Sequence, residues 1–194
     1  MRKLIIHEFV TLDGILQAPG GPDEDRDGGF AHGGWTLPYW HDDIGATFGA
    51  IMQDTDAFLL GRRTYVTHAQ AFEPMPPGDA FGDMMNTPAK YVVSRTLEKP
   101  IWRNTTIIRD DVVGAVRKLK ASAGGTIVTD GSSQLVHTLI EHDLVDELYL
   151  HVYPLALGSG KRVFPGAAGE RRYQLVESRA YPTGVVGVRY ARAS

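Results

Sequence analysis

A glycine, two arginines and a threonine follow one another at Gly61, Arg62, Arg63 and Thr64, directly after a short apolar run at residues 57–60. The run lacks alternation, which predicts a strand buried on both faces of a sheet. The four residues after it open a predicted helix, whose free N–H groups bind anions. Two guanidinium groups beside them suit phosphate. The pattern indicates a phosphate site, and the alternative is a strand-to-helix turn with two solvated arginines.

The same order of features recurs in the second half of the chain. Residues 126–130 form a predicted strand, Gly131 ends it, and Ser132, Ser133 and Leu135 fall in the first turn of a predicted helix. Two such turns at one sheet edge would bind a diphosphate better than either turn alone. The alternative for Ser132 or Ser133 is a simple helix cap.

Two further strand ends carry polar residues. Asp13 and Gly14 mark a sharp turn after a predicted strand at residues 3–12, and Ser94 and Arg95 end another predicted strand. In an open α/β sheet, ligands bind at the carboxyl ends of the strands. We therefore expect Asp13 and Gly14 to lie at a site, and Ser94 and Arg95 are candidates to hold a second phosphate. Plain, solvated turns are the alternatives.

The remaining segments alternate between predicted strands and helices. Further strands are predicted at residues 90–94, 105–108, 147–152, 173–179 and 185–191, and helices at residues 38–53, 62–70, 110–122 and from about residue 132. Residues 71–88 contain several prolines and are predicted to be irregular. Parallel βαβ units closed by a C-terminal antiparallel hairpin predict an α/β domain with a mixed sheet of about eight strands. The length predicts one domain over residues 1–194.

Residues 17–37 are predicted to form a long loop, of the kind that usually serves as a lid. Within it, Asp23, Asp25 and Asp27 match the first half of a calcium-binding loop. The twelfth position of that motif requires a glutamate, and Gly34 stands there instead. The seven histidines show no H-x-x-x-H pair. We therefore predict no metal site.

Composition narrows the class of protein. A net charge of −3 without a basic run argues against nucleic-acid binding, and no apolar run approaches the ~20 residues of a membrane span. The absence of cysteine excludes disulfides and thiolate chemistry. The N-terminus becomes acidic at Glu8, too soon for a signal peptide. These features predict a cytoplasmic protein that does not bind nucleic acid or span a membrane.

Several segments, taken together and in this order, resemble a known superfamily. They are residues 11–14 (Thr-Leu-Asp-Gly), 60–65 (Leu-Gly-Arg-Arg-Thr-Tyr), 128–132 (Val-Thr-Asp-Gly-Ser), 144–148 (Leu-Val-Asp-Glu-Leu), Pro154 and 157–160 (Leu-Gly-Ser-Gly). The chain resembles dihydrofolate reductase-like proteins, specifically the reductase domain at the C-terminus of bifunctional riboflavin-biosynthesis deaminase-reductases. The resemblance implies a three-layer α/β fold and NADPH as the hydride donor.

The resemblance also implies where the cofactor lies. Gly61, Arg62, Arg63 and Thr64 would meet the adenosine 2′-phosphate and the diphosphate, Val93, Ser94 and Arg95 would hold the 2′-phosphate, and Gly131, Ser132, Ser133 and Leu135 would bind the diphosphate. Val10, Asp13, Gly14, Ile15 and Leu16 would line the nicotinamide end.

The chain departs from the pattern of dihydrofolate reductases at one position. Residues 35–38 (Trp-Thr-Leu-Pro) match the start of their helix after the lid, yet Trp40 stands where the pteridine-binding carboxylate is expected. An indole cannot accept the two hydrogen bonds of an aminopyrimidine edge. Folate reduction is therefore not expected, unless Asp42 or Asp43 supplies the carboxylate. Asp13 and Trp40 are the candidate catalytic residues.

We interpret the chain as an NADPH-dependent reductase of the riboflavin type, acting on a C=N or C=O group of a small molecule that need not be the riboflavin precursor. A small carbonyl or quinone reductase, and a non-catalytic dinucleotide-binding or stress-response protein, are the alternatives. The resemblance also implies a homodimer. In support, the chain ends in a strand that we expect at a sheet edge, with Val185, Val186 and Val188 on both of its faces.

Overall fold

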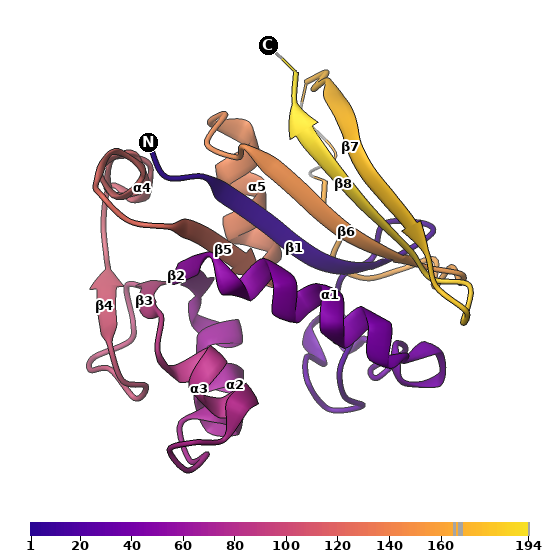
Figure 1. Ribbon diagram of the computed structural model, residues 1–194, viewed down its shortest axis with the longest axis horizontal. Coiled ribbons are helices and arrows are strands. Elements are labelled where there is room, and N and C mark those ends of the chain that lie inside the picture. The colour runs from indigo at the N-terminus through magenta and orange to yellow at the C-terminus, as the bar shows by residue number, and fades with distance from the viewer. Residues whose placement is uncertain (165, 167–168, 194) are drawn as a thin grey trace.

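A single eight-stranded sheet organises the computed structural model, which describes residues 1–164, 166 and 169–193 (Figure 1). The strand order is β4-β3-β2-β5-β1-β6-β8-β7. The strands are β1 (Leu4–Thr11), β2 (Thr55–Gly61), β3 (Ala89–Val93), β4 (Thr105–Ile108), β5 (Thr126–Asp130), β6 (Glu147–Tyr153), β7 (Tyr173–Ala180) and β8 (Val186–Arg192). Neighbours among β1 to β6 pair in parallel, and β8 and β7 close the sheet antiparallel. The predicted mixed sheet is confirmed.

Helices cover both faces of this sheet, which gives the three layers expected of a dihydrofolate reductase-like fold (Figure 1). The helices are α1 (Asp42–Gln53), α2 (Arg62–Phe72), α3 (Ala80–Asn86), α4 (Val112–Ala121) and α5 (Ser133–Glu141). Alternation along β1 sorts its side chains between the layers. Leu4 and Ile6 pack into the core beneath α4 and α5, whereas Ile5 packs into the core beneath α1, α2 and α3.

Two helix predictions need correction. The helix predicted from residue 38 begins at Asp42, because Pro38 lies in a separate 3₁₀ turn (Leu37–Tyr39) and His41 is extended, with its Nδ1 accepting the Asp43 N–H as a cap. The segment predicted to be irregular at residues 71–88 contains α3. Pro74, Pro76 and Pro77 precede α3 and Pro88 follows it, so none of them interrupts the helix. The Asp79 carboxylate caps α3 by accepting the Gly82 N–H.

The hairpin prediction is confirmed, but the edge strand was assigned wrongly. The last strand, β8, lies between β6 and β7, so β7 forms the edge of the sheet. The reason is packing, because β8 carries Val188 and Tyr190 against the core while seven of the eight β7 residues are exposed. Among the described residues, no helix has the length and apolar character needed to span a bilayer.

Candidate functional site

The turns that follow β2 and β5 touch each other at the carboxyl edge of the sheet. Ser132 Oγ accepts the Gly61 N–H at 2.9 Å and donates to Thr64 Oγ1, also at 2.9 Å. Ser132 is therefore used to join the two turns rather than to cap its own helix. Within the described part of the chain, no side chain caps the N-terminus of α2 or of α5. Two helix N-termini with uncapped N–H groups thus meet at one place, which favours an anion with more than one charged group.

Two positions at this junction require glycine, because a side chain would not fit there and because one of them has a positive φ. Gly131 has a φ of +67°, and a Cβ there would lie 3.0 Å from Thr64 Oγ1. A Cβ on Gly61 would lie 3.2 Å from Ser132 Oγ. Ser132 itself is held at a φ of +69°, a conformation that costs a non-glycine residue energy and is often found at ligand sites.

A cavity of about 1180 Å³ runs along both turns. The predicted cofactor residues that line it are Leu16, Gly61, Arg62, Arg63, Thr64, Val93, Ser94, Arg95, Gly131, Ser132, Ser133 and Leu135. The cavity exceeds the roughly 300–1,000 Å³ typical of a site for one small ligand. Its volume therefore admits a ligand larger than one ordinary small molecule.

The two neighbouring arginines of α2 differ in their partners. Among the described residues, no carboxylate forms an ion pair with Arg62, whereas Arg63 Nη1 lies 2.5 Å from Asp27 Oδ2 in the loop at residues 17–37. Lys161 binds Asp25 and Asp27 of the same loop, at 2.5 and 3.0 Å. The hydrogen bond from Arg63, followed by that from Lys161, lowers the pKa of Asp27 to about 2. Arg62 is thus available to a phosphate, while Arg63 fastens the loop to α2.

The same ion pairs bear on the calcium-like motif. Asp25 and Asp27 are bound by cationic side chains, and Asp23 pairs with Arg26. No group of three or more potential metal-binding side chains gathers anywhere in residues 1–164, 166 and 169–193.

The far end of the cavity carries further cationic groups. Ser94 Oγ accepts the N–H groups of Thr96 and Leu97, so its hydroxyl proton remains available to a ligand. Arg95 pairs loosely with Asp110 at 3.8 Å, and both side chains are exposed. Arg109, which the sequence interpretation missed, also lines the cavity and donates to the carbonyl oxygen of Glu98 at 3.2 Å.

Hydrogen bonds accepted by Asp13 tie the turn after β1 to the loop after β6. Asp13 accepts the Thr11 hydroxyl at 2.5 Å and the N–H groups of Gly158 and Leu157 at 2.8 and 3.2 Å. The hydrogen bond from Thr11 is the main cause of the lowered pKa of Asp13. Val10 and Ile15 are buried, and Val10, Asp13, Gly14 and Ile15 are not among the residues that line the cavity. Of the residues expected at the nicotinamide end, Leu16 reaches it.

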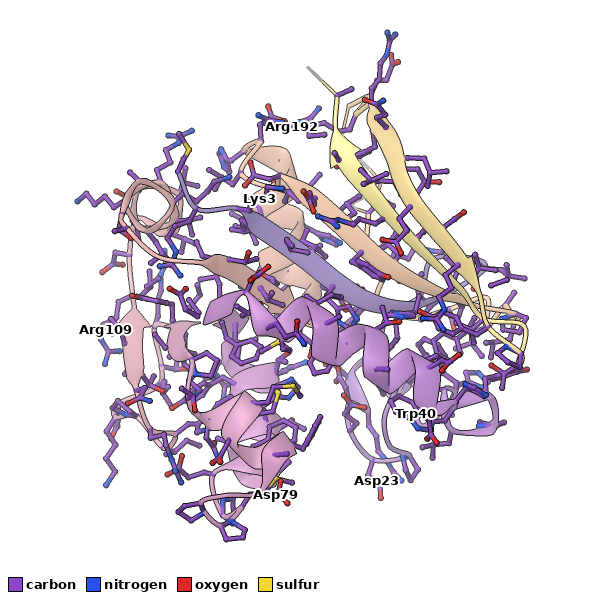
Figure 2. All side chains as sticks on the ribbon, in the orientation of Figure 1. Lys3, Asp23, Trp40, Asp79, Arg109 and Arg192 are labelled. Carbon is purple, nitrogen blue, oxygen red and sulfur yellow. The ribbon has the colours of Figure 1, made fainter. Side chains whose placement is uncertain are left out.

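Trp40 is not among the residues that line this cavity. Its side chain is half-exposed and packs beside Gly45 in the first turn of α1. Figure 2 shows it on the opposite side of the molecule from Arg109, which belongs to the cavity wall. Trp40 therefore does not share the cavity with the predicted site residues that line it.

A buried group of acids and imidazoles lies at the inner end of the cavity, and the sequence interpretation did not identify it. His68 Nε2 lies 3.2 Å from Asp130 Oδ2, and His7 Nδ1 lies 3.7 Å from Asp130 Oδ1. Burial opposes ionisation of Asp130, but these imidazoles outweigh it and hold the pKa of Asp130 well below its usual range. Burial, followed by the charge of Asp130, raises the pKa of Glu8 well above its usual range. Two carboxyl groups whose pKa values are shifted in opposite directions suit opposite roles in proton transfer.

One signal in the sequence pointed to this group. His7 and Glu8 interrupt the otherwise apolar run of β1, and alternation places Glu8 on the same face as Ile6 and Val10. An acid on a buried face is rare unless it is paired or has a function.

A second cavity, of about 720 Å³, lies between α1 and the start of β1 and contains none of the predicted site residues. Its cationic residues already have partners. Arg2 pairs with Asp56, Arg179 with Asp43, and Lys3 and Arg189 with Glu147. We therefore place the candidate functional site in the larger cavity.

Comparisons with known proteins agree with this fold. The family model of the RibD C-terminal domain matches residues 2–187. The uncharacterized protein YyaP of Bacillus subtilis is 28% identical over 192 residues, which cover 97% of this chain and 94% of YyaP.

Two solved structures are similar over nearly the whole chain, each at 16% identity, which shows the fold alone. A putative riboflavin biosynthesis protein from Shewanella has a TM-score of 0.69 and 99% of each chain covered. Dihydrofolate reductase from Enterococcus faecalis, complexed with NADP(H), has a TM-score of 0.63, with 99% of this chain and 97% of that chain covered. The chain belongs to the family of RibD C-terminal domains.

Proposed function

We propose that residues 1–194 form one NADPH-dependent reductase domain that transfers hydride to a C=N or C=O group of a small molecule. The observation that carries this proposal is the junction of two uncapped helix N-termini, α2 and α5, joined through Ser132 at one cavity. A similar fold in a reductase complexed with NADP(H) supports it.

The residues of the cavity fit the charged parts of this cofactor. The N–H groups of the first turns of α2 and α5 would hold the diphosphate, because they have no side-chain caps among the described residues. Arg62, Arg95 and the Ser94 hydroxyl line the cavity on the β3 side and would hold the 2′-phosphate. Arg109 adds a fourth group there that suits phosphate.

Bound NADPH would supply the hydride, and the chain would position the two reactants and exclude water. The loop at residues 17–37 contributes Gln17, Ala18 and Glu24 to the cavity, and Arg63 and Lys161 hold its acidic tip. This loop would cover the reacting groups, which strengthens polar interactions inside the site.

Calorimetric titration with NADPH and NADH, followed by NADPH oxidation at 340 nm against a panel of small aldehydes, quinones and cyclic imines, tests the proposal. We expect NADPH to bind more tightly than NADH and to raise the melting temperature. We also expect NADPH to be oxidised by at least one of these three classes of compound. Binding without any oxidation would favour the non-catalytic alternative. Binding of neither cofactor at millimolar concentration would contradict the proposal.

We also propose that the chain forms a homodimer. The edge strand β7 is exposed along nearly its whole length, and the side chains of Leu175 and Val176 are half-exposed on it. An edge of this kind favours association with another strand or surface. Light scattering at micromolar concentration is expected to give about twice the chain mass of 21.3 kDa. A monomer at that concentration would contradict this proposal and leave the cofactor assignment standing.

A further inference from the structure

Glu8 is a buried acid on the wall of the large cavity. It lies in the middle of β1 with 2% of its surface exposed, and it lines the large cavity. Its Oε1 atom has no hydrogen-bond partner among the described residues. Because buried polar atoms are nearly always paired, an unpaired oxygen in a residue of the cavity wall points to a ligand group that would pair with it.

The order of the strands places Glu8 relative to the proposed cofactor. Ser94 and Arg95 follow β3, and the two phosphate-binding turns follow β2 and β5. The next strand in the sheet is β1. If the 2′-phosphate lies at β3 and the diphosphate at β2 and β5, the nicotinamide half must extend across the edge to β1. There, Glu8 lines the cavity together with Phe9 and Leu16.

The groups that face Glu8 favour its protonated form. Asp130 approaches from β5 and Glu24 from the loop at residues 17–37, and His68 of α2 pairs with Asp130 rather than with Glu8. On β6, the register partner of Glu8 is the uncharged Leu150. Burial and then the charge of Asp130 raise the pKa of Glu8, while the Gly131 N–H opposes this rise. In its protonated form, the Glu8 carboxyl group offers one O–H donor and one acceptor oxygen.

We propose that the Glu8 carboxyl group receives the carboxamide of the nicotinamide ring. A primary carboxamide offers an N–H donor beside a carbonyl acceptor, and a protonated carboxyl group offers the complementary pair. Two hydrogen bonds would fix the orientation of the ring and satisfy the unpartnered Oε1. This inference rests on the proposed use of NADPH, so its test must separate the loss of one contact from the loss of cofactor binding.

The test compares two ligands on three proteins by calorimetry. NADPH carries the carboxamide, whereas 2′-phospho-ADP-ribose has the same phosphates and no nicotinamide. The proteins are the natural chain, Glu8→Leu, and Glu8→Gln as the matched variant that keeps a donor and an acceptor. We expect Glu8→Leu to weaken NADPH binding about tenfold, because about two hydrogen bonds are lost. The affinity of Glu8→Leu for 2′-phospho-ADP-ribose is expected to stay within about twofold of that of the natural chain. The affinities of Glu8→Gln for both ligands are expected to remain within about threefold of those of the natural chain.

The affinity for NADPH divided by the affinity for 2′-phospho-ADP-ribose gives a second readout when it is measured as a function of pH. Ionisation of the phosphates cancels in this ratio, because both ligands carry them. In the natural protein this ratio is expected to fall as pH rises through the pKa of Glu8, whereas in Glu8→Gln it stays constant. Equal weakening of both ligands by Glu8→Leu, or no change in either, would overturn the Glu8 assignment while leaving cofactor binding in place. Failure of the natural protein to bind either ligand would instead overturn the proposed cofactor, and this assignment with it.

Discussion

Two parts of the same sheet edge were expected to bind ligand, and they use their polar groups differently. At the junction of the β2 and β5 turns, the side chains of Ser132 and Thr64 bond to each other and leave the helix N–H groups uncapped. After β1, the Asp13 carboxylate accepts the N–H groups of Leu157 and Gly158 and closes the turn. A turn can bind an anion when the polar side chains around it leave N–H groups of the following helix without a partner. Residue types alone do not reveal this.

The largest expected effect separates backbone strain from crowding at the two turns. Gly131 and Gly14 have similar φ values, +67° and +78°, but only a Cβ on Gly131 would crowd Thr64, at 3.0 Å. Gly131→Ala and Gly14→Ala are each expected to lose about 1–2 kcal/mol of unfolding free energy from strain. Gly131→Ala is expected to weaken NADPH binding at least about tenfold as well, because Thr64 must move.

Urea unfolding measures the first quantity and calorimetric titration the second. Gly14→Ala is the control and is expected to stay within about twofold of the natural affinity for NADPH. Equal losses of affinity in the two variants would show that strain alone, and not the junction with Thr64, governs the site.

The next effect tests the closed turn. Asp13→Ala leaves the N–H groups of Leu157 and Gly158 without their acceptor, and we expect a loss of about 2 kcal/mol in unfolding free energy. NADPH affinity is expected to change less than about twofold, because Asp13 does not line the cavity. A large loss of affinity with unchanged stability would place Asp13 in the site instead.

Asp13 also predicts a pH dependence whose sign is fixed. Its pKa is lowered in the folded protein, so its contribution to stability is present above the unfolded pKa of about 3.9 and is lost as pH falls through the folded value. In Asp13→Asn this contribution is absent at every pH. Urea unfolding is therefore expected to show the natural protein losing its advantage over Asp13→Asn as pH falls from about 5 through the folded pKa of Asp13. A constant difference across that range would contradict the assignment.

A smaller effect distinguishes the two arginines of α2. Arg62 has no carboxylate partner among the described residues, whereas Arg63 binds Asp27. Arg62→Ala is expected to weaken NADPH about tenfold more than NADH, because only NADPH carries the 2′-phosphate. Arg63→Ala is expected to affect both cofactors alike, through the loop. Titrations of both variants with both cofactors measure this, and a reversed pattern would exchange the two roles.

The smallest effect is expected at Trp40. Its half-exposed indole lies beside α1 and not on the cavity wall, so Trp40→Phe should change NADPH affinity less than about twofold. If fluorescence of the other tryptophans reports a larger change, the loop that carries Trp40 must close onto the site when the cofactor binds.

The sequence predicted those features that depend on local pattern. Apolar runs followed by Gly61 and Gly131 identified β2 and β5, and the order of strands and helices identified a parallel sheet closed by a hairpin. The contact of Ser132 with Gly61, 71 residues away, is a tertiary feature that no local pattern contains. The sequence suggested that the two turns share an edge, but not that a single hydroxyl joins them.

The sequence could not show which partner each polar side chain binds. Nothing local distinguishes Arg62 from Arg63, because their difference arises from Asp27 in a distant loop. The pairing of His68 with Asp130 likewise crosses from α2 to β5. Glu8 was visible as an acid in an apolar strand, yet its place on the cavity wall depends on the strand order, which only the structure gives.

The central claim is that the two uncapped helix N-termini bind the cofactor diphosphate, and amide chemical shifts report on those N–H groups directly. In a titration of ¹⁵N-labelled protein with NADPH, we expect the largest shifts at residues 61–64 and 131–135, with 2′-phospho-ADP-ribose producing the same changes. The Leu157 and Gly158 amides, bound to Asp13, are expected to move little. Binding that leaves residues 61–64 and 131–135 unperturbed, and instead shifts residues around the second cavity such as Ala50 and Tyr149, would contradict the account.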